Sequence, residues 1–159
     1  MFHIILFNPE IPPNTGNIMR LCSNTGSSLH LIKPLGFDLN SKNLKRAALD
    51  YSEISSLKVY DSLEDCLSEN KFNNVFAITK FGKENLFSLK LEIDDAFLFG
   101  NETSGLPLEI LNLFTPKNKL RIPMKKQNRS LNLSNAASIV LYEAWRQNNF
   151  KLAEISFKG

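Results

Sequence analysis

Short apolar runs alternate along the chain with longer amphipathic stretches, and this alternation predicts strands that alternate with helices. The predicted strands are residues 4–7, 29–32, 57–60, 75–79, 96–99 and 120–122. The predicted helices are residues 16–25, 41–49, 62–67, 107–114 and 133–144. Thr15 is a suitable N-cap for the first helix, and Gly26 fits the position after its end. The pattern favours an α/β fold with a mostly parallel sheet and helices on both faces.

The last predicted helix is apolar on more than one face. Between residues 139 and 145 only Glu143 and Ala144 interrupt a run of large apolar side chains, and only Glu143 is polar. A helix buried on one side needs an apolar stripe of about 100° or somewhat more, which this segment exceeds. The helix is therefore either enclosed within the domain or in contact with a second subunit. We favour the second interpretation, a homodimer formed through this helix.

Composition fits one globular domain over residues 1–159, with 43% apolar and 22% charged residues. The net charge of +3 is small, but positive residues gather locally. One basic stretch holds Lys117, Lys119, Arg121, Lys125, Lys126 and Arg129, and another holds Lys42, Lys45 and Arg46. Such stretches suit contacts with phosphate groups, although a solvated surface explains them equally well.

Several classes of site are disfavoured. The chain has neither a G-x-G-x-x-G nor a G-x-x-x-x-G-K-[ST] loop after a strand. His3 and His30 have no Cys or carboxylate partner at ligand spacing, so we expect structural roles and no metal site. Cys22 and Cys66 are expected to be small buried apolar residues. The apolar start of the chain is too short for a membrane span or a signal peptide, which favours a cytosolic protein that does not associate with membranes.

Three polar segments follow predicted strands, where parallel sheets place their ligands. In the first, residues 8–20, a helix opening at Gly16 would offer free N–H groups to an anion, but taken alone the segment favours a proline-rich turn with a capped helix. The second, residues 99–107, has Glu102 between two glycines. The third, residues 129–137, carries more Ser and Asn residues than one N-cap requires.

The amino-acid sequences of these three segments resemble the motifs of a known superfamily. They read NPEIPPNTGNIMRLCSNTG, FGNETSGLP with a GxExxGLP element, and RIPM followed by RSLNLSNAASIVLYEAWRQ. All three, in this order, resemble the SPOUT (trefoil-knot) RNA methyltransferases, in particular the small tRNA (cytidine/uridine-2′-O-)-methyltransferases that act on the wobble nucleotide. The resemblance implies an α/β SPOUT fold with a C-terminal trefoil knot, a homodimer through the last helix, S-adenosylmethionine as cofactor and tRNA as substrate.

The resemblance also implies roles for single residues. Catalytic and site-organising positions are matched by Arg20, Asn14, Glu102 and Asn132, and cofactor-binding positions by Ile78, Gly100, Ile122 and Ser130. The candidate RNA-binding residues are Lys42, Lys45, Arg46, Lys125, Lys126, Arg129 and Tyr142. Close relatives usually carry Pro, Arg and Ser where this chain has Asn101, Ser104 and Asn128, a departure that concerns RNA docking.

The implied chemistry is methyl transfer from a sulfonium to a ribose 2′-oxygen. An arginine stays protonated at neutral pH, so we expect Arg20 to hold a phosphate or the developing 2′-oxyanion rather than to act as a base. Asn14 and Glu102 would fix Arg20, while Ser130 and Asn132 would shape the cofactor and ribose side. The alternatives are 2′-O-methylation of another RNA, such as a tRNA D-loop guanosine or ribosomal RNA, and an idle RNA-binding or assembly protein that kept the fold.

Overall fold

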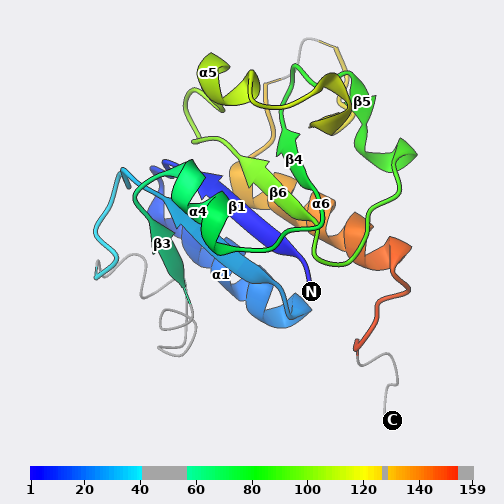
Figure 1. Cartoon of the computed structure of the whole chain (residues 1–159), viewed down its shortest axis with the longest axis horizontal. Coiled ribbons are helices and arrows are strands. Elements are labelled where there is room, and N and C mark those ends of the chain that lie inside the picture. The colour runs from blue at the N-terminus through cyan, green and yellow to red at the C-terminus, as the bar shows by residue number, and fades with distance from the viewer. Residues whose placement is uncertain (41–56, 127–128, 154–159) are drawn as a thin grey trace.

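The computed structural model describes residues 1–40, 57–126 and 129–153, which form a seven-stranded sheet with helices packed against it (Figure 1). The strands are β1 (His3–Phe7), β2 (Ser28–Ile32), β3 (Lys58–Tyr60), β4 (Val75–Ile78), β5 (Glu84–Asn85), β6 (Ala96–Phe99) and β7 (Lys119–Arg121). Their order is β3-β2-β1-β6-β4-β7-β5, and every pairing between them is parallel. The carboxyl ends of the strands therefore meet at one edge of the sheet. The α/β fold and the six predicted strands are confirmed, with ends displaced by about a residue, whereas β5 was not predicted.

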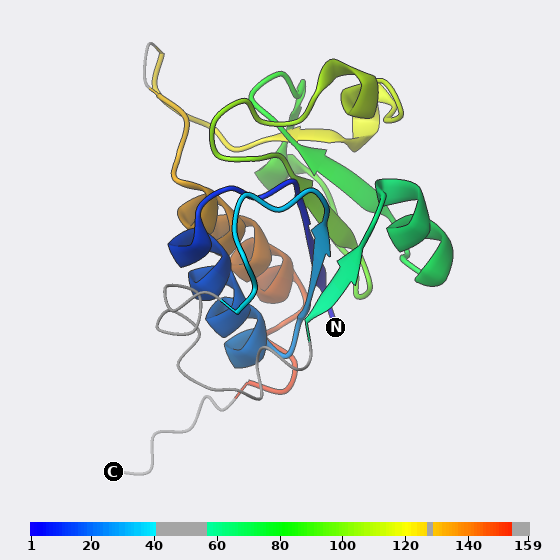
Figure 2. The same ribbon diagram turned by 90° about the vertical axis from the view of Figure 1, so that its left-hand side faces the viewer.

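The helices lie on both faces of the sheet, as expected. They are α1 (Pro12–Thr25), α4 (Leu63–Glu69), α5 (Leu108–Leu111) and α6 (Leu133–Gln147), with short 3₁₀ turns at η1 (Leu86–Ser88) and η2 (Pro116–Asn118). Helices α1 and α6 run side by side on one face (Figure 2). Helices α4 and α5 pack with the apolar residues of the opposite face. The predicted helix at residues 41–49 lies outside the described residues.

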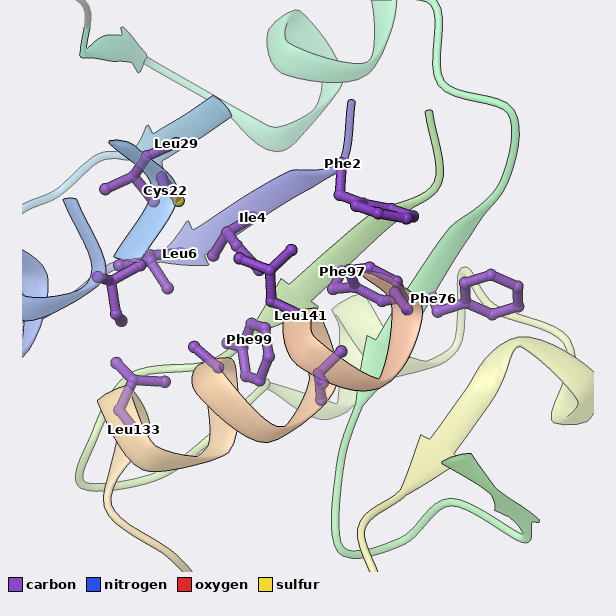
Figure 3. Packing of buried hydrophobic residues seen from close by; sticks show 14 of the residues in the cluster. Phe2, Ile4, Leu6, Cys22, Leu29, Phe76, Phe97, Phe99, Leu133 and Leu141 are labelled. Carbon is purple, nitrogen blue, oxygen red and sulfur yellow. The ribbon is translucent and has the colours of Figure 1, made fainter. Parts of the chain in front are cut away.

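Alternation of side chains along the strands divides the core into two layers. Ile4 and Leu6 of β1 point towards α1 and α6, together with Phe97 and Phe99 of β6 (Figure 3). Ile5, between Ile4 and Leu6, joins the layer under α4 and α5 instead. The central strands are thus buried on both sides, which explains why their sequences are continuous apolar runs.

Helix α1 begins earlier than the sequence predicted. It starts at Pro12, and Thr15 is a fully buried residue of its first turn rather than the N-cap. The two prolines explain the difference, because proline favours the first turn of a helix and holds the preceding residue, here Ile11, in an extended conformation. The predicted end is confirmed, since Gly26 takes a left-handed conformation with φ of 63°.

The other two helices near the sheet edge differ from prediction in length. Helix α5 ends at Leu111 rather than Phe114, and Pro107 is its N-cap. Helix α6 begins with Asn132 as N-cap, whose Oδ1 accepts from the backbone N–H of Ser134 and of Asn135 at 2.9 and 3.4 Å. Its main apolar stripe is buried, whereas Tyr142 remains 47% exposed.

Late and early parts of the chain interleave at one end of the sheet. Strand β7 lies between β4 and β5, although both precede it in the chain. The trefoil knot itself stays a prediction. Within the described ranges, no helix is long and apolar enough to cross a bilayer.

Candidate active site

A cavity of about 400 Å³ lies at the carboxyl edge of the sheet. Its walls come from the segments that follow β1, β4, β6 and β7, together with the start of α6. Parallel α/β sheets bind ligands at this edge. All three polar segments singled out in the sequence contribute residues to the walls, so their expected gathering at one place is confirmed. We refer to this space as the carboxyl-edge cavity.

Glu102 joins the loop after β6 to the start of α1. Its Oε2 accepts from the backbone N–H of Glu10 at 2.8 Å, and its Oε1 accepts from the N–H of Ile11 at 3.2 Å. Oε1 also accepts from the side-chain amide of Asn14 at 3.1 Å. The N-cap residue Ile11 has no capping side chain of its own, so a carboxylate from a distant loop supplies the acceptors. The negative charge at this helix start is therefore the chain's own Glu102 carboxylate. The N–H groups that bind it belong to Glu10 and Ile11, which precede Gly16.

Asn14 extends the connection to α6. Its Oδ1 accepts from the side-chain amide of Asn132 at 3.0 Å, while its own amide donates to Glu102. Asn132 in turn caps α6 through its Oδ1. Asn14 is 6% exposed, so its two amide atoms are held by partners from two other segments. We call Asn14, Glu102 and Asn132 the amide–carboxylate cluster.

The loop carrying Glu102 folds tightly back on itself. Gly105 N donates to Asn101 O at 3.1 Å, and Gly105 has a left-handed φ of 74°. A Cβ on Gly100 would lie 2.0 Å from the carbonyl carbon of Gly105, so only glycine fits there. Oδ1 of Asn101 accepts from the N–H and the hydroxyl of Ser104 at 2.7 and 2.9 Å. Asn101 and Ser104 thus bond to each other and shape this turn.

The four residues matched to cofactor-binding positions, Ile78, Gly100, Ile122 and Ser130, all line the carboxyl-edge cavity. Phe99 and Leu106 add buried apolar surface to the same walls. Apolar walls with a few polar groups and close backbone are typical of sites for small organic ligands.

The remaining candidates lie apart from the cavity walls or at their rim. Arg20 is half-buried on α1, and the described lining residues do not include it. Lys125, Lys126 and Arg129 are exposed on the segment between β7 and α6. Tyr142 is exposed on α6. Lys42, Lys45, Arg46 and Asn128 lie outside the described residues.

The fourth wall comes from the loop after β4, where a ligand site was expected although Lys80 and Phe81 were not singled out. Lys80 and Phe81, in the loop after β4, line the cavity together with Arg121. This loop differs from the other three because it has no Asn, Glu or Ser residue before Glu84. The available signal was a large apolar side chain, Phe81, two residues after the predicted end of the strand. Throughout the described ranges, no group of three or more His, Cys, Asp or Glu residues could hold a metal ion.

Comparison with known proteins gives consistent matches. The SpoU rRNA methylase family matches residues 1–142. A relative from Methylovorus glucosotrophus, a tRNA (cytidine(34)-2′-O)-methyltransferase, is 53% identical over 150 residues, covering 94% of this chain and 97% of its own. A solved structure concerning 2-OH methylation of C/U34 on tRNA superposes with a TM-score of 0.87 at 42% identity, covering 95% of this chain and 98% of the other. The SpoU methyltransferase AviRb from Streptomyces viridochromogenes, solved with the cofactor AdoMet, gives 0.81 at 25% identity, covering 93% and 60%.

Proposed function

The chain belongs to the SpoU rRNA methylase family, and we propose that it is a tRNA 2′-O-methyltransferase acting on the wobble cytidine or uridine. The methyl donor is S-adenosylmethionine, and the acceptor is the ribose 2′-hydroxyl of nucleotide 34. The observation that carries the proposal is the amide–carboxylate cluster, which joins the three segments of the family resemblance beside one cavity. The similarity to tRNA (cytidine(34)-2′-O)-methyltransferases over nearly the whole chain favours tRNA over ribosomal RNA.

The carboxyl-edge cavity fits S-adenosylmethionine in size and in chemistry. Its volume of about 400 Å³ falls within the usual range for small organic ligands. Ile78 and Ile122 offer apolar contact for a purine, while Gly100 and Ser130 offer backbone and hydroxyl groups for the polar parts. When bound, this cofactor supplies an electrophilic methyl group on a sulfonium centre.

The amide–carboxylate cluster has a positioning role in this mechanism. Asn132 begins α6 next to Ser130, and Asn14 begins α1, so the cluster fixes the starts of both helices at the cavity wall. Methyl transfer requires in-line approach of the acceptor oxygen, and holding the reactants in place can account for a large part of the rate. Because these side chains bond to each other, they hold the starts of α1 and α6 in fixed positions relative to each other.

Arg20 is assigned to the RNA. A guanidinium group has N–H donors and no acceptor, which suits it to bind a phosphate or the developing oxyanion rather than to take up the 2′-hydroxyl proton. It lies on α1, the helix whose first turn carries Asn14. We therefore include Arg20 in the catalytic site as a residue that contacts the RNA substrate. It would do so from α1, because it does not line the cavity.

The proposal includes assembly and location. The family resemblance implies a homodimer through α6, and this helix keeps apolar surface for it, since Tyr142 is exposed and Ile139 and Trp145 are half-buried. Lys125, Lys126 and Arg129 form an exposed basic strip near the cavity, suited to tRNA phosphates. The substrate is cytoplasmic, so we place the enzyme in the cytoplasm.

Methylation of purified RNA tests the function directly. The protein is incubated with labelled S-adenosylmethionine and either total tRNA or ribosomal RNA, and the 2′-O-methylated nucleotide is mapped. We expect label at nucleotide 34 of tRNA. Label at another nucleotide or in ribosomal RNA would contradict the assigned substrate, and no label in any RNA would support an idle RNA-binding protein.

A further inference from the structure

An exposed aromatic ring stands at the mouth of the carboxyl-edge cavity. Phe81 lines the cavity, yet 67% of it is exposed to solvent. The Nζ of Lys80 lies over its ring, 5.1 Å from the centroid. The other phenylalanine of the wall, Phe99, is 2% exposed and belongs to the core. Phe81 and Lys80 therefore present a flat apolar face and a positive charge to whatever approaches the cavity.

The loop that carries this pair is held firmly. Phe81 N donates to Thr79 Oγ1 at 3.3 Å, and Gly82 N donates to Thr79 O at 3.2 Å. Gly82 is buried against β7, where a Cβ would come within 2.7 Å of Lys119 O and Leu120 C. Because the turn is packed this closely on β7, the backbone that carries the ring of Phe81 is held in place.

Exposure alone does not indicate a function, because soluble proteins commonly expose single apolar residues. Phe87 in η1 is such a residue, 50% exposed, and it is not among the described cavity-lining residues. Phe81 differs from Phe87 in its place beside the cavity and in the lysine over its ring. This difference makes Phe87 a matched control.

We propose, as an extension of the proposed function, that Phe81 and Lys80 form a stacking platform for a base of the substrate RNA beside the methylated nucleotide. The ring stacks on the base, and the Lys80 ammonium pairs with a neighbouring phosphate. Single-stranded RNA loops are commonly recognised by stacking unpaired bases on aromatic side chains.

Charge favours RNA over the cofactor as the occupant of this platform. A nucleotide brings a phosphate next to its base, which matches a lysine next to a ring, whereas S-adenosylmethionine has no phosphate. Arg121, also exposed in the cavity wall, adds positive charge on the neighbouring strand β7. The exposed Lys125 and Lys126 follow on the same segment.

RNA binding measured without catalysis tests the platform. The affinity of the full chain for an anticodon stem-loop RNA is measured by fluorescence anisotropy for Phe81→Ala, Phe81→Leu and Phe81→Tyr, with Phe87→Ala as control. Loss of one stacked base predicts roughly a 10-fold or greater weakening for the first two variants. Phe81→Tyr keeps a ring and should bind as the unmodified chain does, as should Phe87→Ala.

Salt dependence separates the two members of the pair. Phe81→Ala should weaken binding equally at low and high salt, since no charge is removed. Lys80→Ala should reduce the log–log salt slope by about one, as expected for one lost phosphate contact. Affinity for S-adenosylmethionine, measured by calorimetry, should fall much less than affinity for RNA in Phe81→Ala, because the platform assigns the solvent-exposed part of the ring to RNA.

Three results would overturn the platform: unchanged RNA affinity in Phe81→Ala, full affinity in Phe81→Leu, or an equally large loss of cofactor affinity in Phe81→Ala. The RNA-binding assay tests the platform and the methylation assay tests the proposed function, so one proposal can be contradicted without the other. RNA binding that depends on Phe81, in a chain that methylates no RNA, would overturn only the proposed function. Methylation of nucleotide 34 with binding indifferent to Phe81 would overturn only the platform.

Discussion

Two polar clusters sit on this sheet, and they differ in place and in chemistry. The amide–carboxylate cluster of Asn14, Glu102 and Asn132 adjoins the cavity at the carboxyl edge. The second, which we call the histidine cluster, consists of His3, His30, Tyr60 and Asn70 and crosses β1, β2 and β3 to the end of α4. In it, His3 Nδ1 lies 3.2 Å from His30 Nε2, and His30 Nδ1 lies 3.1 Å from the Tyr60 hydroxyl.

The histidine cluster is enclosed. His30 is fully buried, and burial lowers its pKa to about 3, with further contributions from His3 and Lys58. Burial likewise lowers the pKa of His3, although Asp94 opposes the shift. Phe72 packs edge-on against both histidine rings. The expected structural role of the two histidines agrees with this setting, because both rings are satisfied by protein partners and kept neutral.

The comparison shows that residue type alone is a poor guide to function. Histidine is the side chain most often used for proton transfer near neutral pH, yet here its place in the fold keeps it neutral and out of reach. Asparagines are ordinary residues, yet at the carboxyl edge they join two helix starts beside a cavity. Disturbing the first cluster should therefore alter activity, with some loss of stability, whereas disturbing the second should alter stability alone.

The largest effect on the methylation rate is expected from Arg20. This residue lies on α1, the helix whose first turn carries Asn14, and its replacement tests whether the catalytic site includes residues beyond the amide–carboxylate cluster. Arg20→Ala should reduce methylation of tRNA by about 1,000-fold or more, since it removes a charged group proposed to stabilise the reacting centre. Affinity for S-adenosylmethionine should stay within about 2-fold, in keeping with Arg20 lying outside the cavity walls. Methylation rates and cofactor calorimetry measure both. Full turnover in this variant would remove Arg20 from the mechanism.

Removing the carboxylate of the first cluster should affect activity and stability together. Glu102→Ala leaves the N–H groups of Glu10 and Ile11 and the amide of Asn14 without their acceptor. We expect about 100-fold slower methylation through misplaced helix starts. Loss of these hydrogen bonds should also lower the free energy of unfolding by about 1–3 kcal/mol.

The exposed Glu109 on α5 supplies the matched control, because Glu109→Ala removes the same charge outside the cluster. Denaturant unfolding and steady-state kinetics compare the two variants. Equal rates in both would show that the cluster does not position the site.

The histidine cluster should set an acid limit on stability. The unfolded chain takes up a proton on His30 below its ordinary pKa of about 6.5, while the folded chain does so only near 3. Stability is therefore complete above about pH 7 and falls as the pH drops through this window. Between about pH 7.5 and pH 5 the loss from His30 alone is about 2 kcal/mol. The carboxylate of Glu143, whose pKa is lowered by its bond to Arg146, titrates below that range.

The variant His30→Gln separates titration from packing. It keeps a polar side chain but cannot gain a proton, so the difference in unfolding free energy between about pH 7.5 and pH 5 should shrink, with His3 accounting for a smaller remainder. Urea unfolding at both pH values measures the difference. An undiminished loss would assign the acid sensitivity to other groups.

The smallest effect on tRNA binding is expected from the exposed lysines Lys125 and Lys126, which lie outside both clusters. Lys125→Ala and Lys126→Ala should each lower the log–log salt slope of tRNA binding by about one and weaken binding only modestly at physiological salt. Neither should change the free energy of unfolding by more than about 0.5 kcal/mol, since both side chains are exposed. Affinity that is flat between low and physiological salt in the unmodified chain would exclude this strip as the RNA surface.

The candidate site was predictable in outline but not in its bonds. The sequence indicated which strands end at the ligand edge, and Asn14, Glu102, Asn132, Ile78 and Gly100 do meet there. The start of α1 was misplaced because its capping carboxylate is 88 residues away from Asn14 and lies on another loop. Strand β5 was missed because two residues carry no periodicity. Lys80 and Phe81 were not singled out because a phenylalanine near a strand end is most often a core residue, and only the structure shows this one exposed beside a cavity.

The sequence by itself determined the elements, since apolar periodicity reflects which side of a strand or helix is buried, and that is a local property. Strand by strand, residues 4–7, 29–32, 75–79 and 96–99 were assigned in this way, each within about a residue of the strand in the structure. Only the tertiary structure decided that β1 lies beside β6, which brings Glu102 to Asn14, and beside β2, which brings His3 to His30. Strand order depends on how distant segments share one core, so it determined which polar residues face the cavity and which are enclosed.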